Sequence, residues 1–158
     1  MKLVIKIFRI SILFILPVIL LSWGYTGHRK ISLNAGLSFN EEMAQFDAWP
    51  AILASHASDA DARKDDDPNE GPKHYIDIDN YDIFLTSGRI PQTYDSIIDI
   101  YGYTFARSQG FLPWATQTTY DSLVQCFIRR EWDKAVLFAA DIGHYVADGH
   151  MPMHITAN

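Results

Sequence analysis

The segment that decides the fold is EWDKAVLFAADIGHYVADGHMPMH, residues 131–154. Its apolar residues recur every three or four positions, which is the period of one face of an α-helix. The expected apolar stripe consists of Trp132, Val136, Ala139, Gly143 and Val146. Pro152 marks the end of this pattern, since proline cannot continue a helix. The segment therefore predicts a helix from about Glu131 to Gly149.

Two other segments carry the same helical period. Residues 93–107 repeat Tyr94, Ile97, Ile98, Tyr101 and Phe105 at helical spacing. After the break GFLPW, a further helix opens at Pro113 or Trp114. Residues 73–79, KHYIDID, end in the alternation of a short strand or extended segment.

The part nearer the N-terminus also indicates helices. A short helix is expected over Arg29 to Phe39, and Asn40 is typical of an N-cap. The helix after Asn40 is expected to reach about His56, with a kink near Pro50. Little in the chain is typical of a sheet. We therefore expect an all-α fold, a multi-helix bundle with long polar loops.

The first 22 residues have the layout of a secretory signal peptide. Three basic residues precede an almost wholly apolar run from Ile10 to Leu21, and Ser22 is small. The run is short for a membrane span, although a retained anchor is the alternative. We expect cleavage between Ser22 and Trp23, one domain over residues 23–158, and a secreted or periplasmic protein. The chain after cleavage holds 10 Lys and Arg against 19 Asp and Glu, a surface that does not attract polyanions.

Three of the histidines lie close together in GHYVADGHMPMH, residues 143–154. His144 and Asp148 are four residues apart, so they share one helix face about a turn apart. Asp141 lies on the same face, and His154 follows the turn at Pro152. Imidazole with carboxylate suits zinc. Because this face lies opposite the apolar stripe, the alternative is that it is simply solvated.

The polar segment from Ser58 to Pro72 is rich in carboxylates, which are usually solvated. A calcium loop is excluded, because the sixth position of the best match is Glu70 instead of glycine and the twelfth is Ile76. The lone Cys126 excludes an internal disulfide and is interpreted as an incidental thiol.

Four motifs in this order resemble the S1/P1 nuclease and zinc-dependent phospholipase C superfamily. They are WGYTGH at 23–28, ASDADAR at 57–63, GPKHYIDID at 71–79 and HYVADGHMPMH at 144–154. The resemblance is to bacterial S1/P1-like members and covers the chain from Trp23 onward. It implies a mostly helical phospholipase C/P1 nuclease-type domain with three zinc ions in a cleft.

The resemblance also assigns ligands. Trp23 would bind one zinc through its free amine and carbonyl oxygen, and His28 would bind the same zinc. A second zinc would take Asp59, His74 and His144. Asp148 would bridge these two zincs. His154 would bind the third zinc, whose other ligands lie further downstream, so the domain is expected to be truncated and this site incomplete.

The sequence departs from the family in two places that matter for the site. Asp61 is a rival to Asp59 as the loop ligand, and Asp59 is preferred because its fifteen-residue step to His74 is the nuclease-type step. In the ending HMPMH, His150 is kept, and His150 and Asp141 are expected to support ligands without being ligands themselves.

The resemblance implies a hydrolase that attacks phosphodiesters with a zinc-bridged hydroxide, with Asp59 and Asp148 in catalytic positions. The favoured activity is that of an endonuclease or 3′-nucleotidase acting on single-stranded nucleic acid, because five residues separate Trp23 from His28. Bases would stack on aromatic side chains such as Tyr75, Tyr145 and Trp114, although each could equally belong to the core. The alternatives are a phospholipase C that cleaves headgroups and an inactive zinc-binding fragment. A monomer is expected, with no protein partner implied.

Overall fold

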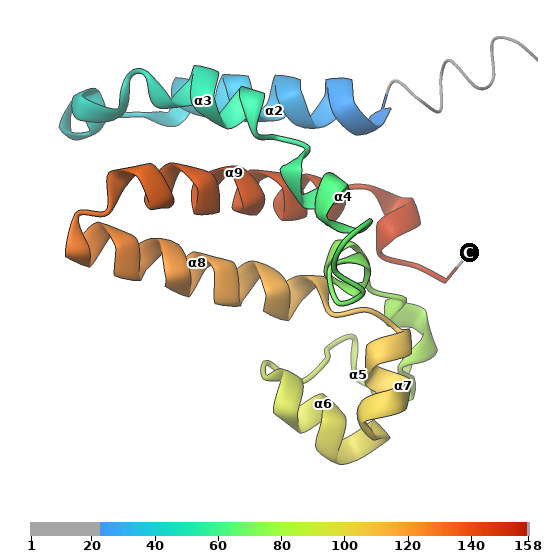
Figure 1. The fold of residues 1–158 in the computed structure, drawn as a ribbon. Coiled ribbons are helices and arrows are strands. Elements are labelled where there is room, and N and C mark those ends of the chain that lie inside the picture. Colours follow the sequence, from blue (N-terminus) through green and yellow to red (C-terminus); the bar gives the residue numbers. More distant parts are fainter. Residues whose placement is uncertain (1–22, 158) are drawn as a thin grey trace, which may run out of the picture.

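The computed structural model of the chain describes residues 23–157, and this part is all-helical, with no strand. The expected signal peptide, residues 1–22, lies outside the described residues. Helix α9 (Trp132–Asp148) runs between two layers, with α8 (Leu112–Arg129) on one side (Figure 1). On its other side lie α2 (His28–Asn34) and α3 (Trp49–Ser55). The fold class expected from the sequence is thus confirmed at the level of an all-α protein.

Helices α8 and α9 form an antiparallel hairpin, in which the bounds of α9 and the start of α8 are close to those that the sequence predicts. The turn between them is made by Arg130, which adopts the left-handed backbone conformation with φ 59°. Pro113 lies in the first turn of α8, where its missing N–H has no intrahelical partner to lose. Val136 and Ala140 of α9 pack with Leu53 of α3, which joins the hairpin to the layer above it.

The N-terminal layer is more broken than expected. Helix α2 continues into the 3-10 helix η2 (Ala35–Ser38), and the expected helix after Asn40 is divided into η3 (Glu41–Phe46) and α3. Pro50 lies in the first turn of α3 instead of kinking a longer helix, because proline is tolerated in a first turn and not inside a helix. Gly36 lies against the Pro50 ring, where a Cβ would approach Cγ to 2.5 Å.

The polar segment from Ser58 to Pro72 is not only a loop. It contains helix α4 (Asp59–Arg63) and leads into the 3-10 helix η4 (Gly71–His74). The residues after His74 are extended but form no strand, and the Ile76 amide donates to the carbonyl of His154 at 2.8 Å. This bond ties the segment after η4 to η6 (Pro152–His154) beyond the end of α9.

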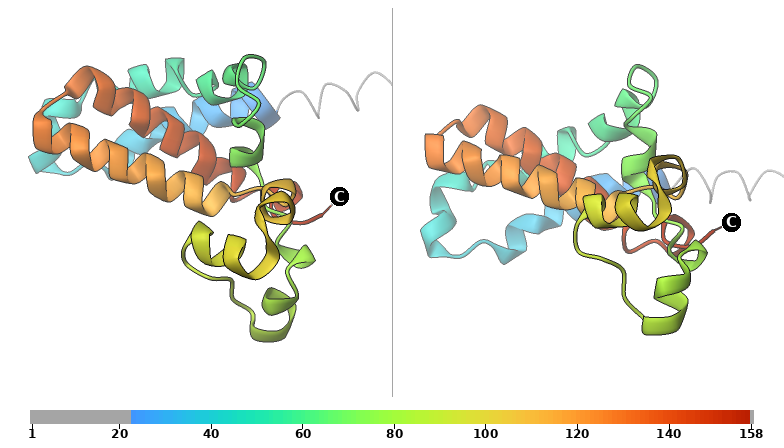
Figure 2. Two further views of the ribbon diagram at one scale, coloured as in Figure 1. Left: turned by 60° about the horizontal axis from the view of Figure 1, so that its bottom comes forward. Right: turned by 90° about the horizontal axis from the view of Figure 1, so that it is seen from below.

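Four short helices lie beyond the start of α8 (Figure 2). They are η5 (Ile78–Asn80), α5 (Asp82–Ser87), α6 (Tyr94–Tyr101) and α7 (Tyr103–Ser108). The single helix expected over 93–107 is interrupted at Gly102, where φ is 80°. Tyr81, Ile97 and Trp114 belong to the core that fixes this group to α8. Among the described residues, no helix is long and apolar enough to cross a membrane.

Candidate metal centre

The polar face of α9 is buried. His144 and Asp148 are 1% and 3% exposed, whereas Val146 of the expected apolar stripe is 43% exposed. The interpretation of this face as merely solvated is therefore wrong. It is covered because α2, α4 and η4 all pack against α9.

His74 enters the same site from η4. Its Nδ1 lies 2.9 Å from Oδ2 of Asp148 and 3.0 Å from Nε2 of His144. The other nitrogen of His144, Nδ1, lies 2.7 Å from the carbonyl oxygen of Ala57 and is hydrogen-bonded to it. That bond fixes the ring of His144 with Nε2 directed at the cluster, as outer partners of metal-binding histidines do.

The loop carboxylate that joins the cluster is Asp61. Its Oδ1 lies 3.5 Å from Nε2 of His144 and 3.7 Å from Nδ1 of His74. Asp59 instead pairs with His56, with 2.6 Å between Oδ2 and Nδ1, at the surface. Residues two apart on a helix point about 200° apart, so α4 can direct only one of its two aspartates inward. This geometry favours Asp61 as the loop carboxylate, whereas the sequence favoured Asp59.

Nδ1 of His74 and Nε2 of His144 thus lie close to each other and to two carboxylate oxygens, Oδ2 of Asp148 and Oδ1 of Asp61. His144 Nε2 lies 3.3 Å from Oδ2 of Asp148. With the distances given above, the measured separations between these atoms range from 2.9 to 3.7 Å. In a tetrahedral zinc site with ligands at about 2.0–2.1 Å, ligand atoms lie about 3.3–3.4 Å apart. The donor types and their spacing therefore fit a zinc ion.

A second group of donors faces the other oxygen of Asp148. Nε2 of His28 lies 3.3 Å from Oδ1, and Nε2 of His154 lies 3.9 Å from the same oxygen. The ring of His28 stacks on that of His144 with centroids 3.8 Å apart, and Nδ1 of His154 is hydrogen-bonded to the carbonyl of His74 at 2.9 Å. The two oxygens of one aspartate therefore face two sets of histidines.

Trp23 lies in the π-helical turn η1 (Trp23–Gly27), which leads directly into α2 at His28. The structure thus brings together six of the residues expected as ligands or as rivals: His28, Asp61, His74, His144, Asp148 and His154. It does not bring in Asp59, which pairs with His56.

The cluster is strongly coupled electrostatically. Burial alone would raise the pKa of Asp148, but hydrogen bonds from His144, His28 and His74 hold its pKa far below the usual range. Burial likewise opposes the charge on His144, yet its bonds to Asp148 and Asp61 raise its pKa to about 9. For His74, burial outweighs the bond to Asp148 and lowers the pKa. The metal-free site therefore holds a proton on His144 that a metal ion would displace.

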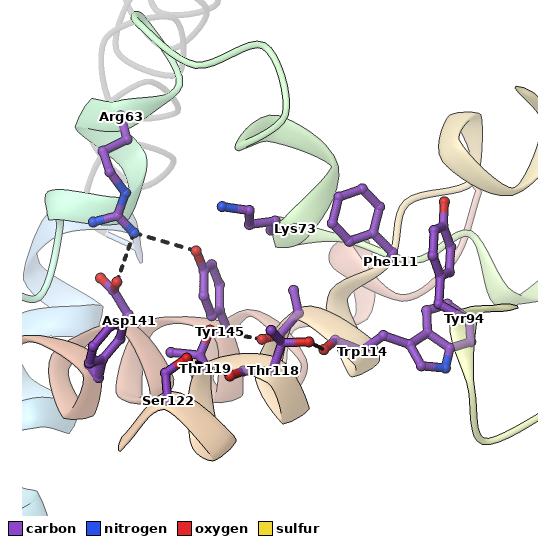
Figure 3. A pocket seen from close by; sticks show the side chains of 12 residues that line it. Arg63, Lys73, Tyr94, Phe111, Trp114, Thr118, Thr119, Ser122, Asp141 and Tyr145 are labelled. Carbon is purple, nitrogen blue, oxygen red and sulfur yellow. Dashed lines mark hydrogen bonds and ion pairs between the residues drawn. The ribbon is translucent and has the colours of Figure 1, made fainter. Parts of the chain in front are cut away.

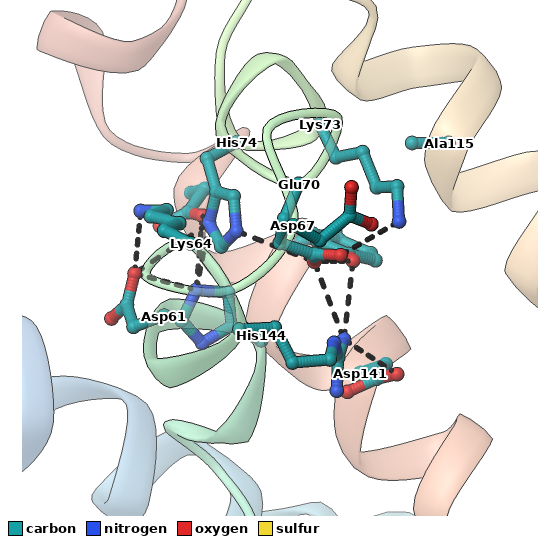
Figure 4. A network of polar contacts seen from close by, with 12 residues as sticks. Asp61, Lys64, Asp67, Glu70, Lys73, His74, Ala115, Asp141 and His144 are labelled. Atoms are coloured by element: carbon teal, nitrogen blue, oxygen red, sulfur yellow. Dashed lines mark hydrogen bonds and ion pairs between the residues drawn. The ribbon is translucent and has the colours of Figure 1, made fainter.

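A second polar layer, formed by side chains around Glu70, lies beside His74, as Figure 4 shows. Its centre is Glu70, which is 1% exposed and receives hydrogen bonds from Tyr145, Lys73 and Arg63. Burial would raise the pKa of Glu70, but these bonds lower it to about 2. The sequence reasoning gave Glu70 no role; its place four residues before His74 was the available signal.

The two residues expected to support ligands lie outside the cluster. Asp141 pairs with Arg63, with 2.9 Å between Oδ2 and NH2. His150 is exposed, and its Nδ1 is hydrogen-bonded to the carbonyl of Val146 at 2.7 Å. Neither residue forms a defined contact with a cluster histidine.

A pocket of about 500 Å³ opens beside this layer (Figure 3). Its lining includes Arg63, Lys73, Trp114 and Tyr145. Trp114 and Tyr145 are 7% and 2% exposed, so the structure uses these aromatics mainly for packing. Tyr75, the third aromatic considered for base stacking, is half-buried.

No family model matches the chain, and no curated protein or solved structure matches it either.

Proposed function

We propose that this chain is a zinc-dependent phosphodiester hydrolase, of the S1/P1 nuclease or 3′-nucleotidase type, acting on single-stranded nucleic acid. The observation that carries the proposal is Asp148, whose two carboxylate oxygens face separate sets of histidine nitrogens. A carboxylate in this position can hold two metal ions at the short separation that two-metal phosphodiester hydrolysis requires, about 3.5–4 Å.

The residues divide between two metal positions. His74, His144, Asp61 and one oxygen of Asp148 would hold the first zinc, and His28 with the other oxygen would contribute to the second. When bound, zinc supplies positive charge for phosphate oxygens and lowers the pKa of water near neutrality. This charge matters because the chain from Trp23 onward has a formal net charge of −9. The chain itself orients the ligands, and His74, His144 and Asp148 are buried.

There are two alternatives to a nuclease. The first is phospholipase C activity, and the second is a zinc-binding domain without turnover. Both would use the same donors, so only substrate turnover separates them. The signal-like residues 1–22 and the spacing from Trp23 to His28 support an exported nuclease.

The decisive experiment uses the protein beginning at Trp23, loaded with zinc and freed of excess metal by dialysis. Zinc per chain is measured by atomic emission, and turnover is measured on single-stranded DNA and on phosphatidylcholine vesicles. We expect bound zinc and cleavage of the DNA. Cleavage of the lipid alone would support the phospholipase, and zinc without any turnover would support the non-catalytic domain.

The choice between the two loop aspartates gives a matched pair of variants. If structural zinc sites contribute about 10–16 kcal/mol over four ligands, Asp61→Asn should weaken zinc binding about 100- to 1000-fold. Asp59→Asn makes the same change of charge two residues away and should leave the affinity unchanged, since Asp59 pairs with His56. Competition with a chromogenic chelator measures both affinities. The opposite ranking would restore Asp59 as the ligand.

Zinc binding is expected to release about one proton from His144 at about pH 7.5, because its pKa of about 9 lies above this pH and the ligand must be neutral. Calorimetric titrations in two buffers of different ionisation heat measure this release, which should vanish above about pH 9.

The same pKa determines how the stability of the metal-free protein changes with pH. In the metal-free protein, the stabilisation from charged His144 is present below 6.5, the unshifted pKa, and is lost as the pH rises through about 9. Zinc uptake without proton release at pH 7.5 would contradict the predicted displacement of a proton from His144.

A further inference from the structure

Glu70 lies on the side of His74 that faces away from the cluster. Its Oε1 is 3.6 Å from Nε2 of His74, while Nδ1 of the same ring is directed at Asp148 and His144. Figure 4 shows the carboxylate between His74 and Lys73. The imidazole of His74 is thus placed between the donor cluster on one edge and a buried carboxylate on the other.

The position of this carboxylate is fixed by three donors from three elements. Tyr145 of α9 donates its hydroxyl to Oε1, Lys73 of η4 donates to Oε2 at 2.7 Å, and Arg63 of α4 donates to Oε1 at 3.3 Å. Arg63 is itself held by Asp141 at 2.9 Å. Glu70 therefore cannot turn toward solvent without breaking several charge-assisted hydrogen bonds.

Nε2 of His74 has no other partner. It is buried and accepts or donates no hydrogen bond within ordinary limits, although the Glu70 oxygen lies just beyond that distance. The Tyr145 ring packs edge-on against His74 with centroids 5.3 Å apart. Glu70 is therefore the acceptor within reach when Nε2 carries the proton.

The tautomer of a metal-binding histidine is set by the hydrogen bond of its second nitrogen. We infer that Glu70 is a positioning residue that accepts the Nε2–H of His74 and so directs the Nδ1 lone pair at the metal. This inference rests on the proposed metal binding, but it does not depend on which phosphodiester is cleaved. Arg63, Lys73 and Tyr145 act through Glu70 by holding its carboxylate.

The test measures metal affinity in the chain beginning at Trp23. Glu70→Gln, nearly the same shape, should weaken zinc binding about 10- to 100-fold, the usual effect of removing such an outer partner. It should also shift the visible absorption bands of the cobalt-substituted protein, because the ligand field of His74 changes. Asp66→Asn is the matched control: it removes one carboxylate from the same segment, where Asp66 is exposed, and should change neither readout.

A second variant covers the case in which Glu70→Gln fails to fold. Tyr145→Phe keeps the packing ring and removes one hydrogen bond to Glu70, so it should weaken zinc binding about 2- to 10-fold. Circular dichroism in a chelator checks the fold of each variant. Folded variants that both bind zinc within about 2-fold of the unsubstituted chain would overturn the inference, and so would a chain that binds no zinc. Zinc weakened by Glu70→Gln in a chain that cleaves no nucleic acid would uphold Glu70 and refute only the nuclease.

Discussion

Asp148→Asn is expected to weaken both metal positions and abolish turnover, the largest effect of any single substitution in the site. The amide keeps the shape of the side chain but loses its charge and replaces one oxygen by an NH2 group, which cannot bind a metal. Because Oδ2 faces His74 and His144 while Oδ1 faces His28, either orientation of the amide damages one position and weakens the other. Each zinc should lose about 100- to 1000-fold in affinity, the share of one ligand in a four-ligand site.

Zinc per chain after dialysis, measured by atomic emission, should fall below two in Asp148→Asn. The control is Asp133→Asn, which makes the same change in the first turn of the same helix, where Asp133 is exposed. Circular dichroism in a chelator should show that both variants remain helical. An Asp148→Asn protein that retained two zinc ions per chain would exclude a bridging role for this aspartate.

The long helices could be predicted because their sequences are periodic on their own. Helix α9 begins and ends within one residue of its expected bounds, and α8 begins within two residues of its expected start. Which face of α9 is buried could not be predicted from that period, since the stripe containing Val146 is partly exposed and the face of His144 is covered. Burial here depends on segments more than sixty residues away, which bring His28 and His74 against α9.

The choice of loop ligand shows a second limit of the sequence. The fifteen-residue step to His74 favours Asp59, but a count of residues does not show which way each side chain points. Because Asp59 opens helix α4, the backbone rotates by about 100° per residue and Asp61 turns toward the histidines. The role of Glu70 was hidden for a related reason: an acidic run is usually solvated, and only the fold shows that one of its carboxylates is enclosed.

The second metal position gives the other large expected effect. On its side of Asp148, the described residues contribute Oδ1 and Nε2 of His28, with His154 more distant from Oδ1 at 3.9 Å. Zinc in proteins takes four ligands or more, so two further donors are required. The turn that contains Trp23 leads directly into His28. The free amine and the carbonyl oxygen of Trp23 would supply both donors if the mature chain starts there.

One added glycine before Trp23 is therefore expected to remove this zinc completely while the zinc at His74 and His144 remains. The added residue converts the amine into an amide, whose nitrogen lone pair is delocalised into the carbonyl and cannot bind a metal. Trp23→Phe keeps the free amine and should retain both ions, because the proposed donors belong to the backbone and not to the indole. The zinc content per chain is measured for the chain beginning at Trp23, for the chain with the added glycine and for Trp23→Phe. An extended chain with undiminished zinc would mean that the remaining ligands come from elsewhere, whereas a loss in Trp23→Phe alone would assign the effect to the ring.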